Sequence, residues 1–136
     1  MSVVYNKFQP FVANAANGKY NLGADQLKVI LTDTIPTTGM VKLSDLTAIS
    51  MTNLSSPNVT VTASTQTAGT YKLVANQLTL TATGTVPQFR YVVLYDSVPT
   101  NFELIAWYDY GVEVNMISGD GLTVGFDLTN GVLTLA

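Results

Sequence analysis

The chain has 136 residues, of which 47% are hydrophobic and 11% charged, and it contains neither cysteine nor histidine. This length suits one domain with a single core. Six basic against nine acidic residues give a formal net charge of −3, which lacks the positive charge of a nucleic-acid-binding protein. Without Cys or His there is no thiolate nucleophile, no imidazole base and no zinc site of the usual ligands. We therefore expect a protein that is not an enzyme and needs no cofactor.

Neither a signal peptide nor a transmembrane helix is expected. The first residues mix polar side chains and Pro10 with apolar ones, and Lys7 is the basic residue near the start. A secretory signal has a basic start followed by an apolar run, and this segment has no such layout. No stretch approaches the about 18 consecutive apolar residues of a transmembrane helix. We expect synthesis in the cytoplasm and no membrane contact.

A short helix is predicted in an N-terminal segment, residues 1–18, ahead of a β domain over residues 19–136. Apolar residues recur there at spacings of three and four, as in an amphipathic helix, and they are Tyr5, Phe8, Phe11, Val12, Ala15 and Ala16. Asn17-Gly18 suits the end of a helix. Because Pro10 has no N–H to donate, the helix either begins near Pro10 or is kinked there.

After Gly23 the pattern changes to alternation and β-branched residues, which predicts an all-β fold: a single-domain antiparallel β-sandwich or barrel-like fold. The predicted strands are 26–32, 59–63, 70–74, 77–83, 89–95, 102–110, 112–117, 122–126 and 132–135, with a less regular segment at 46–50. Segments 70–74 and 77–83 are expected to pair as a hairpin across Ala75-Asn76. Residues 50–58 are predicted to form a long loop.

Two of these segments, 89–95 and 102–110, are apolar on both sides. This pattern predicts strands that are covered on both faces, in the middle of a sheet or at a subunit contact. Together with the low charge content, it favours a chain that buries apolar surface against other molecules. A monomer with a neutral coat of Thr, Ser and Asn is the alternative.

The charges are unevenly distributed along the sequence. Residues 1–90 carry all six basic and three acidic residues, and residues 91–136 carry six acidic residues. Either these acidic side chains lie singly in turns, or opposite parts of neighbouring copies face each other. A calcium site or a glycosidase carboxylate pair is also conceivable among Asp109, Glu113, Asp120 and Asp127. However, the spacing is not that of a calcium loop and an Asp-Gly turn explains Asp120, so no metal-binding or catalytic residue is assigned.

The densest aromatic group allows two interpretations. It could form a platform that binds sugars or single-stranded bases, and its members are Tyr91, Tyr95, Trp107, Tyr108 and Tyr110. For bases the accompanying positive charge is small, since only Arg90 is close in sequence. The same side chains are also ordinary packing material for the core of a small β domain.

Four segments follow each other along the chain: FVANAANGKYNLGADQLKVILTDTIP, TAGTYKLVANQLTLTATG, FRYVVLYD and GLTVGFDLTNGVLTLA. In order and spacing they resemble a family of small β-rich structural proteins of tailed bacteriophages. The resemblance covers most of the chain, and its motifs are structural rather than catalytic. The segment between Ala48 and Val59 departs from the family pattern because it is short and lacks a Gly-rich loop.

The resemblance implies a head decoration or cement protein, which binds the outer capsid surface across neighbouring major capsid subunits and stabilises it. It also implies a location on the virion, a homo-oligomer with a trimer favoured, and the major capsid protein as partner. Nucleic acid, membrane and small-molecule substrates are not expected. Weak contacts to several subunits at once would reinforce each other through effective concentration.

Capsid contacts are expected from the N-terminal segment or from the loop at 50–58. The candidate residues are Tyr5, Phe8, Phe11, Val12, Leu54 and Pro57. The alternative functions are a phage tail or fibre component, or a carbohydrate-binding surface module that uses Trp107 and the neighbouring tyrosines.

Overall fold

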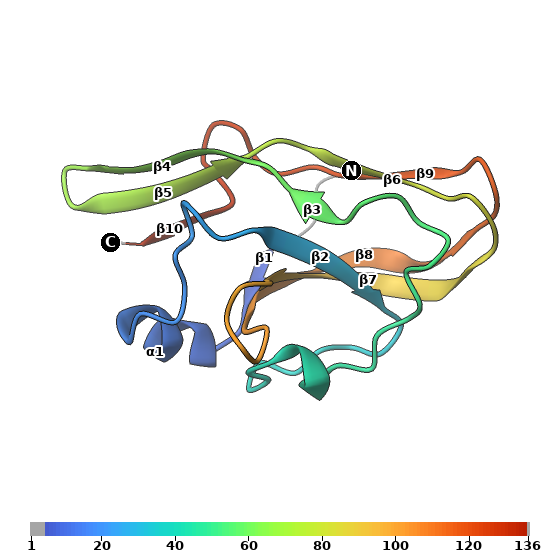
Figure 1. The fold of residues 1–136 in the computed structure, drawn as a ribbon, viewed down its shortest axis with the longest axis horizontal. Helices are drawn as coiled ribbons and strands as arrows, with labels where there is room; N and C mark the ends of the chain where they lie inside the picture. The colour runs from blue at the N-terminus through green and yellow to red at the C-terminus, as the bar shows by residue number, and fades with distance from the viewer. Residues whose placement is uncertain (1–4, 136) are drawn as a thin grey trace.

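The computed structural model describes residues 5–135, which form antiparallel strands with one short α-helix, α1, and one 3₁₀ turn, η1 (Figure 1). The all-β expectation with a short N-terminal helix is confirmed. The elements in chain order are β1 (Tyr5–Lys7), α1 (Pro10–Ala16), β2 (Leu27–Thr32), η1 (Leu43–Asp45), β3 (Asn58–Val59), β4 (Val61–Thr67), β5 (Thr70–Ala75), β6 (Leu78–Thr81), β7 (Val86–Asp96), β8 (Leu104–Met116), β9 (Gly121–Val124) and β10 (Leu133–Leu135).

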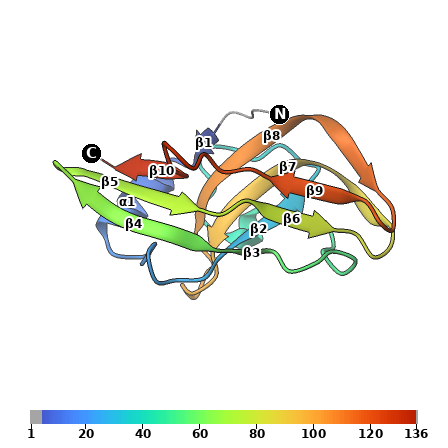
Figure 2. The same cartoon turned by 90° about the horizontal axis from the view of Figure 1, so that it is seen from above.

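The strands form three sheets in two layers. The largest sheet has the order β1-β8-β7-β2-β3, and the two smaller sheets have the orders β10-β5-β4 and β6-β9. Figures 1 and 2 show the two smaller sheets next to each other over one face of the largest sheet. The main hydrophobic core combines side chains of both layers, among them Leu31 and Leu94 from the large sheet and Leu73, Leu80 and Leu122 from the small ones.

The other face of the large sheet is covered by the segment between β2 and β3, which contains η1 and runs beneath the sheet in Figure 1. A second core forms there, in which Phe8, Tyr91, Val93, Tyr95, Leu104 and Trp107 are buried and against which Met40, Leu43 and Leu46 pack. Strands β7 and β8 therefore lie in the middle of the sheet, and residues 91–96 and 104–107 are covered on both faces, as the apolar pattern predicts, whereas residues 111–113 of β8 are exposed. The chain itself covers the two apolar segments, so their pattern requires no subunit contact.

The helix begins at Pro10, in the first turn, where the missing N–H of proline costs no hydrogen bond. It ends at Ala16, and Gly18 follows with a φ of +73°, the left-handed conformation that glycine adopts readily at helix ends. The helix is shorter than the apolar spacing suggests. Tyr5 lies in β1, which pairs with β8, and Phe8 lies in the link between β1 and α1.

The hairpin expected across Ala75-Asn76 is wrong. Strand β5 pairs with β4 and β10, and β6 pairs with β9, so the chain continues from one small sheet into the other (Figure 2). The tight turn lies earlier, at Ala68-Gly69, where φ is +51° and +82°. Two consecutive residues with positive φ are what a two-residue hairpin turn requires, and the structure gives neither Ala75 nor Asn76 a positive φ.

Other strand boundaries also differ from the predicted ones. Segments 102–110 and 112–117 form one long strand, β8, which passes through Gly111 with a φ of +97° where the register with β7 shifts. Segment 59–63 is divided between β3 and β4, which belong to different sheets. Segment 46–50 forms no strand and contributes a single bridge from Ala48 to Thr32.

Candidate functional site

Two of the N-terminal contact candidates are core residues. Phe8 is 0% exposed and belongs to the second core, while Phe11 is 1% exposed in the main core, where its ring centroid lies 4.9 Å from that of Tyr20. Their assignment as capsid contacts is therefore corrected: both rings hold the N-terminal segment onto the β-sheets. Val12, one position further along α1, is 51% exposed, and Tyr5 is half-buried.

Leu54 and Pro57, the candidates from the loop at 50–58, are half-buried. Leu54 packs against the main core and bridges to Ala82, and the next residue, Ser55, exchanges backbone and side-chain hydrogen bonds with Thr81. The Pro57 carbonyl accepts a hydrogen bond of 3.1 Å from the N–H of Val29 in β2. The loop is thus attached to β6 and to β2.

The five aromatic candidates do not form one patch. Tyr91, Tyr95 and Trp107 are at most 9% exposed and lie in the second core, where the Tyr91 and Trp107 rings meet edge to face at 5.9 Å. Tyr108 and Tyr110 are half-buried and pack against the main core on the opposite face of the sheet. Burial raises the pKa of Tyr108 above its ordinary value. The structure therefore favours the core interpretation of this group over a sugar platform.

A short cleft of about 250 Å³ lies beside the two outer tyrosines, between β8 and β9, and its walls are Val92, Tyr108, Tyr110 and residues 121–125. The Tyr108 ring is held there by edge contacts with Tyr5 at 5.9 Å and with Phe126 at 6.3 Å. The described residues place no basic or acidic side chain in its walls. The polar side chains in its walls are those of Tyr108, Tyr110 and Thr123.

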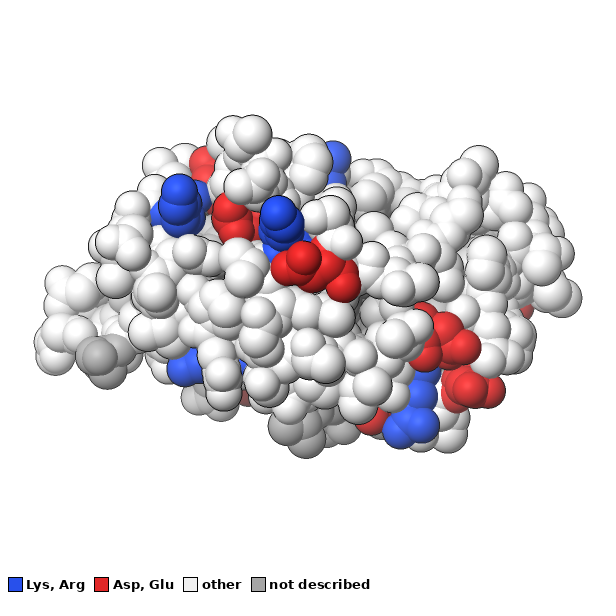
Figure 3. Space-filling model, turned by 90° about the horizontal axis from the view of Figure 1, so that it is seen from below, with Lys and Arg blue, Asp and Glu red and all other residues white. Residues whose placement is uncertain are grey.

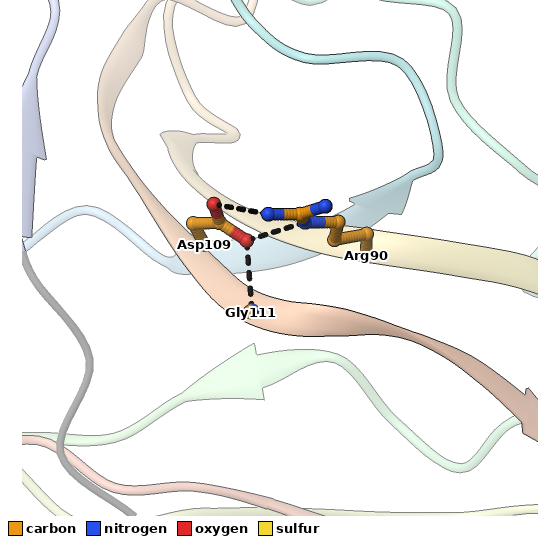
Figure 4. Close-up of polar contacts among 3 residues, drawn as sticks. All are labelled: Arg90, Asp109 and Gly111. Atoms are coloured by element: carbon orange, nitrogen blue, oxygen red, sulfur yellow. Dashed lines mark hydrogen bonds and ion pairs between the residues drawn. The ribbon is translucent and has the colours of Figure 1, made fainter.

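Arg90 and Asp109 form an ion pair across β7 and β8 (Figure 4). The Arg90 Nε and a terminal guanidinium nitrogen donate to the two carboxylate oxygens at 2.8 and 3.1 Å. Asp109 also accepts a 2.8 Å hydrogen bond from the N–H of Gly111, and these bonds hold the pKa of Asp109 below its ordinary value. The pair joins β7 and β8 where the register of their ladder shifts.

The remaining acidic candidates mostly serve turns. Asp120 accepts from the N–H of Ile117 at 2.9 Å, and Asp127 accepts from the N–H groups of Thr129 and Asn130 at 2.8 Å. Within residues 5–135 no three acidic side chains come together in a way that could hold a metal ion. On the face in Figure 3, basic and acidic side chains lie next to each other rather than in separate patches.

A surface with two grooves, lined by both apolar and polar residues, lies at the end of the molecule that carries α1. One groove, of about 370 Å³, runs between the β1–α1 segment and β10, and the other, of about 240 Å³, runs between α1 and β4–β5. Leu135 borders both grooves and is 39% exposed. We call this region the helix-end surface and define it by Tyr5, Lys7, Val12, Ala15, Tyr71 and Leu135.

Sequence reasoning identified Tyr5 and Val12 of this surface but missed Leu135 and Tyr71, which come from distant strands. Other large apolar side chains that are exposed were also missed, and they are Ile35, Val98, Phe102, Val112, Ile117 and Leu128. Of these, only Val112 lies in a strand, β8, and the other five lie in turns and loops, whose exposure the sequence pattern does not show.

Comparisons of the chain with models of known protein families, with curated protein sequences and with solved structures find no match. Among the described residues, no helix is long and apolar enough to cross a membrane.

Proposed function

We propose that this chain is a structural protein of a tailed-phage virion that decorates the outer head surface, binding across neighbouring major capsid subunits and stabilising them. The sequence resemblance suggests this role, and the helix-end surface is the observation that supports it in the structure. That surface exposes Leu135, which borders both grooves, and Val12 on α1. The proposed location is the virion head, and the proposed partners are the major capsid protein and further copies of the chain, with a trimer favoured.

The geometry of the helix-end surface suits a partner segment in extended conformation. Strands β1 and β10 are the outermost strands of their sheets, and both border the larger groove. An outermost strand presents backbone groups that can pair with another chain, and neighbouring pockets then accept alternate side chains. Contacts of this kind to two or three subunits at once would give firm attachment from individually weak interfaces.

The carbohydrate-binding alternative loses its support, because Trp107 is 9% exposed and its ring packs against Tyr91 inside the second core. A tail or fibre location differs from a head location in copy number and in the particle fraction that contains the protein. The test described next separates the two.

The experiment measures binding of the purified chain to heads of the virus that encodes it, prepared without the chain. Val12→Asp and Leu135→Asp place a charge on the helix-end surface, and we expect each to reduce occupancy strongly. Ile117→Asp is the matched control, because Ile117 is 63% exposed and lies in the β8–β9 turn, at the other end of the molecule in Figure 1. Wild-type binding to tails instead of heads, or equal binding by all variants, would contradict the proposal.

A large N-terminal deletion is a poor version of this test. Removal of residues 2–17 would take away Phe8 and Phe11, both of which are fully buried. Truncation of one large buried aromatic side chain alone costs about 3–5 kcal/mol, so the deletion would report on folding. The exposed positions avoid that ambiguity.

A further inference from the structure

The end of β7 buries an acidic side chain that has no basic partner. Asp96 is 0% exposed, its Oδ1 accepts a hydrogen bond of 3.1 Å from the N–H of Val98, and its Oδ2 accepts no hydrogen bond from the N–H and O–H groups of the described residues. The ion pair found within residues 5–135 joins Arg90 and Asp109 and leaves Asp96 without a cation. A buried charge in such a position is costly, so the group favours its neutral form.

The groups that face Asp96 are acidic or neutral. Asp25, in the loop between α1 and β2, is half-buried and within side-chain hydrogen-bonding reach. Glu103, across the β7–β8 turn, is 5% exposed, and its carbonyl accepts from the N–H of Asp96 at 3.0 Å. The Tyr20 hydroxyl donates to a backbone carbonyl of β8 at 2.7 Å and interacts electrostatically with both Asp96 and Glu103. Strand β2 contributes the apolar Leu27, directly opposite Asp96.

Two carboxylates have no hydrogen to share, so Asp96 and Asp25 can form a hydrogen bond only when one of them carries a proton. Burial is the largest influence on Asp96, followed by the neighbouring carboxyl group of Asp25, and together they raise its pKa to about 7, although the N–H of Val98 acts in the opposite direction. When Asp96 and Asp25 lie side by side as in the structure, the pair therefore binds one proton at a pH at which two exposed aspartates would both be ionised.

We propose that Asp96 and Asp25 form a proton-dependent latch that holds the β7–β8 turn against the loop between α1 and β2. With one proton shared, a hydrogen bond joins the two carboxyl groups. When that proton passes to solvent, the carboxylates repel each other and the charge on Asp96 lacks a partner. Ser97 ties the same turn to the Gln26 carbonyl through its N–H at 3.2 Å and its hydroxyl at 2.6 Å, and these bonds open with the latch.

The latch controls an apolar and strained turn. Val98 is 60% exposed and Phe102 is 42% exposed. Phe102 has a φ of +52°, an unfavourable value for a residue with a side chain. Its carbonyl also accepts from the N–H of Leu43, so the turn contacts the segment that covers the second core. Opening of the latch would loosen this turn while the three sheets stay folded. This inference does not depend on the proposed capsid function.

The test is native-state hydrogen exchange of the full chain, followed by NMR and corrected for the intrinsic pH dependence of exchange. The Ser97 amide reports on the latch, and the Gly119 amide, bonded to the Ala82 carbonyl at 2.8 Å, is the reference. Because opening releases one proton, we expect the opening constant at Ser97 to rise about tenfold per pH unit between about 4 and 7 and then level off. Asp96→Asn should remove this dependence, and Asp33→Asn, an exposed control, should keep it.

A second measurement needs no variant. In a carboxyl-carbon NMR titration of the wild-type chain, Asp96 should titrate near neutral pH, far above an ordinary aspartate. Asp25→Asn should lower that midpoint without bringing it to the ordinary value, because burial remains. The latch is refuted if Asp96 titrates like an exposed aspartate, if Ser97 exchanges in parallel with Gly119 at every pH, or if Asp96→Asn keeps the wild-type pH dependence.

Discussion

Gly131, two residues before β10, is a position where a single methyl group should destabilise the fold. Its φ is +84°, and a Cβ there would lie 2.5 Å from the Leu73 carbonyl oxygen and 2.8 Å from Lys72 Cγ. That carbonyl also accepts from the N–H of Val132 at 2.6 Å, so it cannot move away without weakening the β5–β10 pairing. Left-handed strain costs about 1–2 kcal/mol and overpacking about 1–3 kcal/mol. Gly131→Ala should therefore lower the free energy of unfolding by roughly 2–5 kcal/mol.

Gly18→Ala is the matched control. Gly18 has a similar φ of +73°, but no atom lies within 4 Å of its Cβ position. The free energy of unfolding of the Gly18→Ala variant should therefore fall by the backbone strain alone, about 1–2 kcal/mol. Urea unfolding, followed by circular dichroism, measures the stability of both variants. Their midpoint urea concentrations are compared with the same dependence of the free energy of unfolding on urea concentration. Equal losses in the two variants would refute the close approach of Gly131 to β5, and with it the placement of β10 beside β5.

Three further predictions concern the cores and the charges. Trp107→Ala should cost about 3–5 kcal/mol, and the fluorescence of wild-type Trp107 should not respond to added sugars. Because the pKa of Asp96 is higher in the folded chain than the ordinary 3.8, the native state binds more protons, and the free energy of unfolding should fall as pH rises from about 4 to 7. Urea unfolding of Asp96→Asn should lack this fall, whose slope is about 1.4 kcal/mol per pH unit. Arg90→Met should let the pKa of Asp109 rise toward its ordinary value, as a carboxyl NMR titration would show.

Local chemistry allowed much of the strand pattern to be predicted. Pro10 and Gly18 delimit the helix, and runs of apolar, β-branched or alternating residues located β2, β7 and β9 to within a few residues. These features depend on neighbours in sequence. The pairing of the strands could not be predicted from neighbours in sequence. The link after β5, for example, carries no signal that the next strand belongs to another sheet.

The candidate site was harder to predict than the strands. Phe8 and Val12 belong to the same apolar spacing, yet one is buried and the other half-exposed, because the chain leaves β1 before the helix begins. The pairing of Arg90 with Asp109 depends on a register that shifts along β7 and β8. The interaction of Asp96 with Asp25 joins two residues that are distant in sequence. Each of these outcomes is set by tertiary packing, which a single sequence does not specify.

The copy number of the chain relative to the major capsid protein, in purified particles separated into heads and tails, tests the proposed function most directly. The proposal predicts that the chain is found on heads, in an amount comparable to the major capsid protein, and that it is released as folded protein when the heads are stripped. Absence from purified particles, or a few copies confined to the tail fraction, would contradict it.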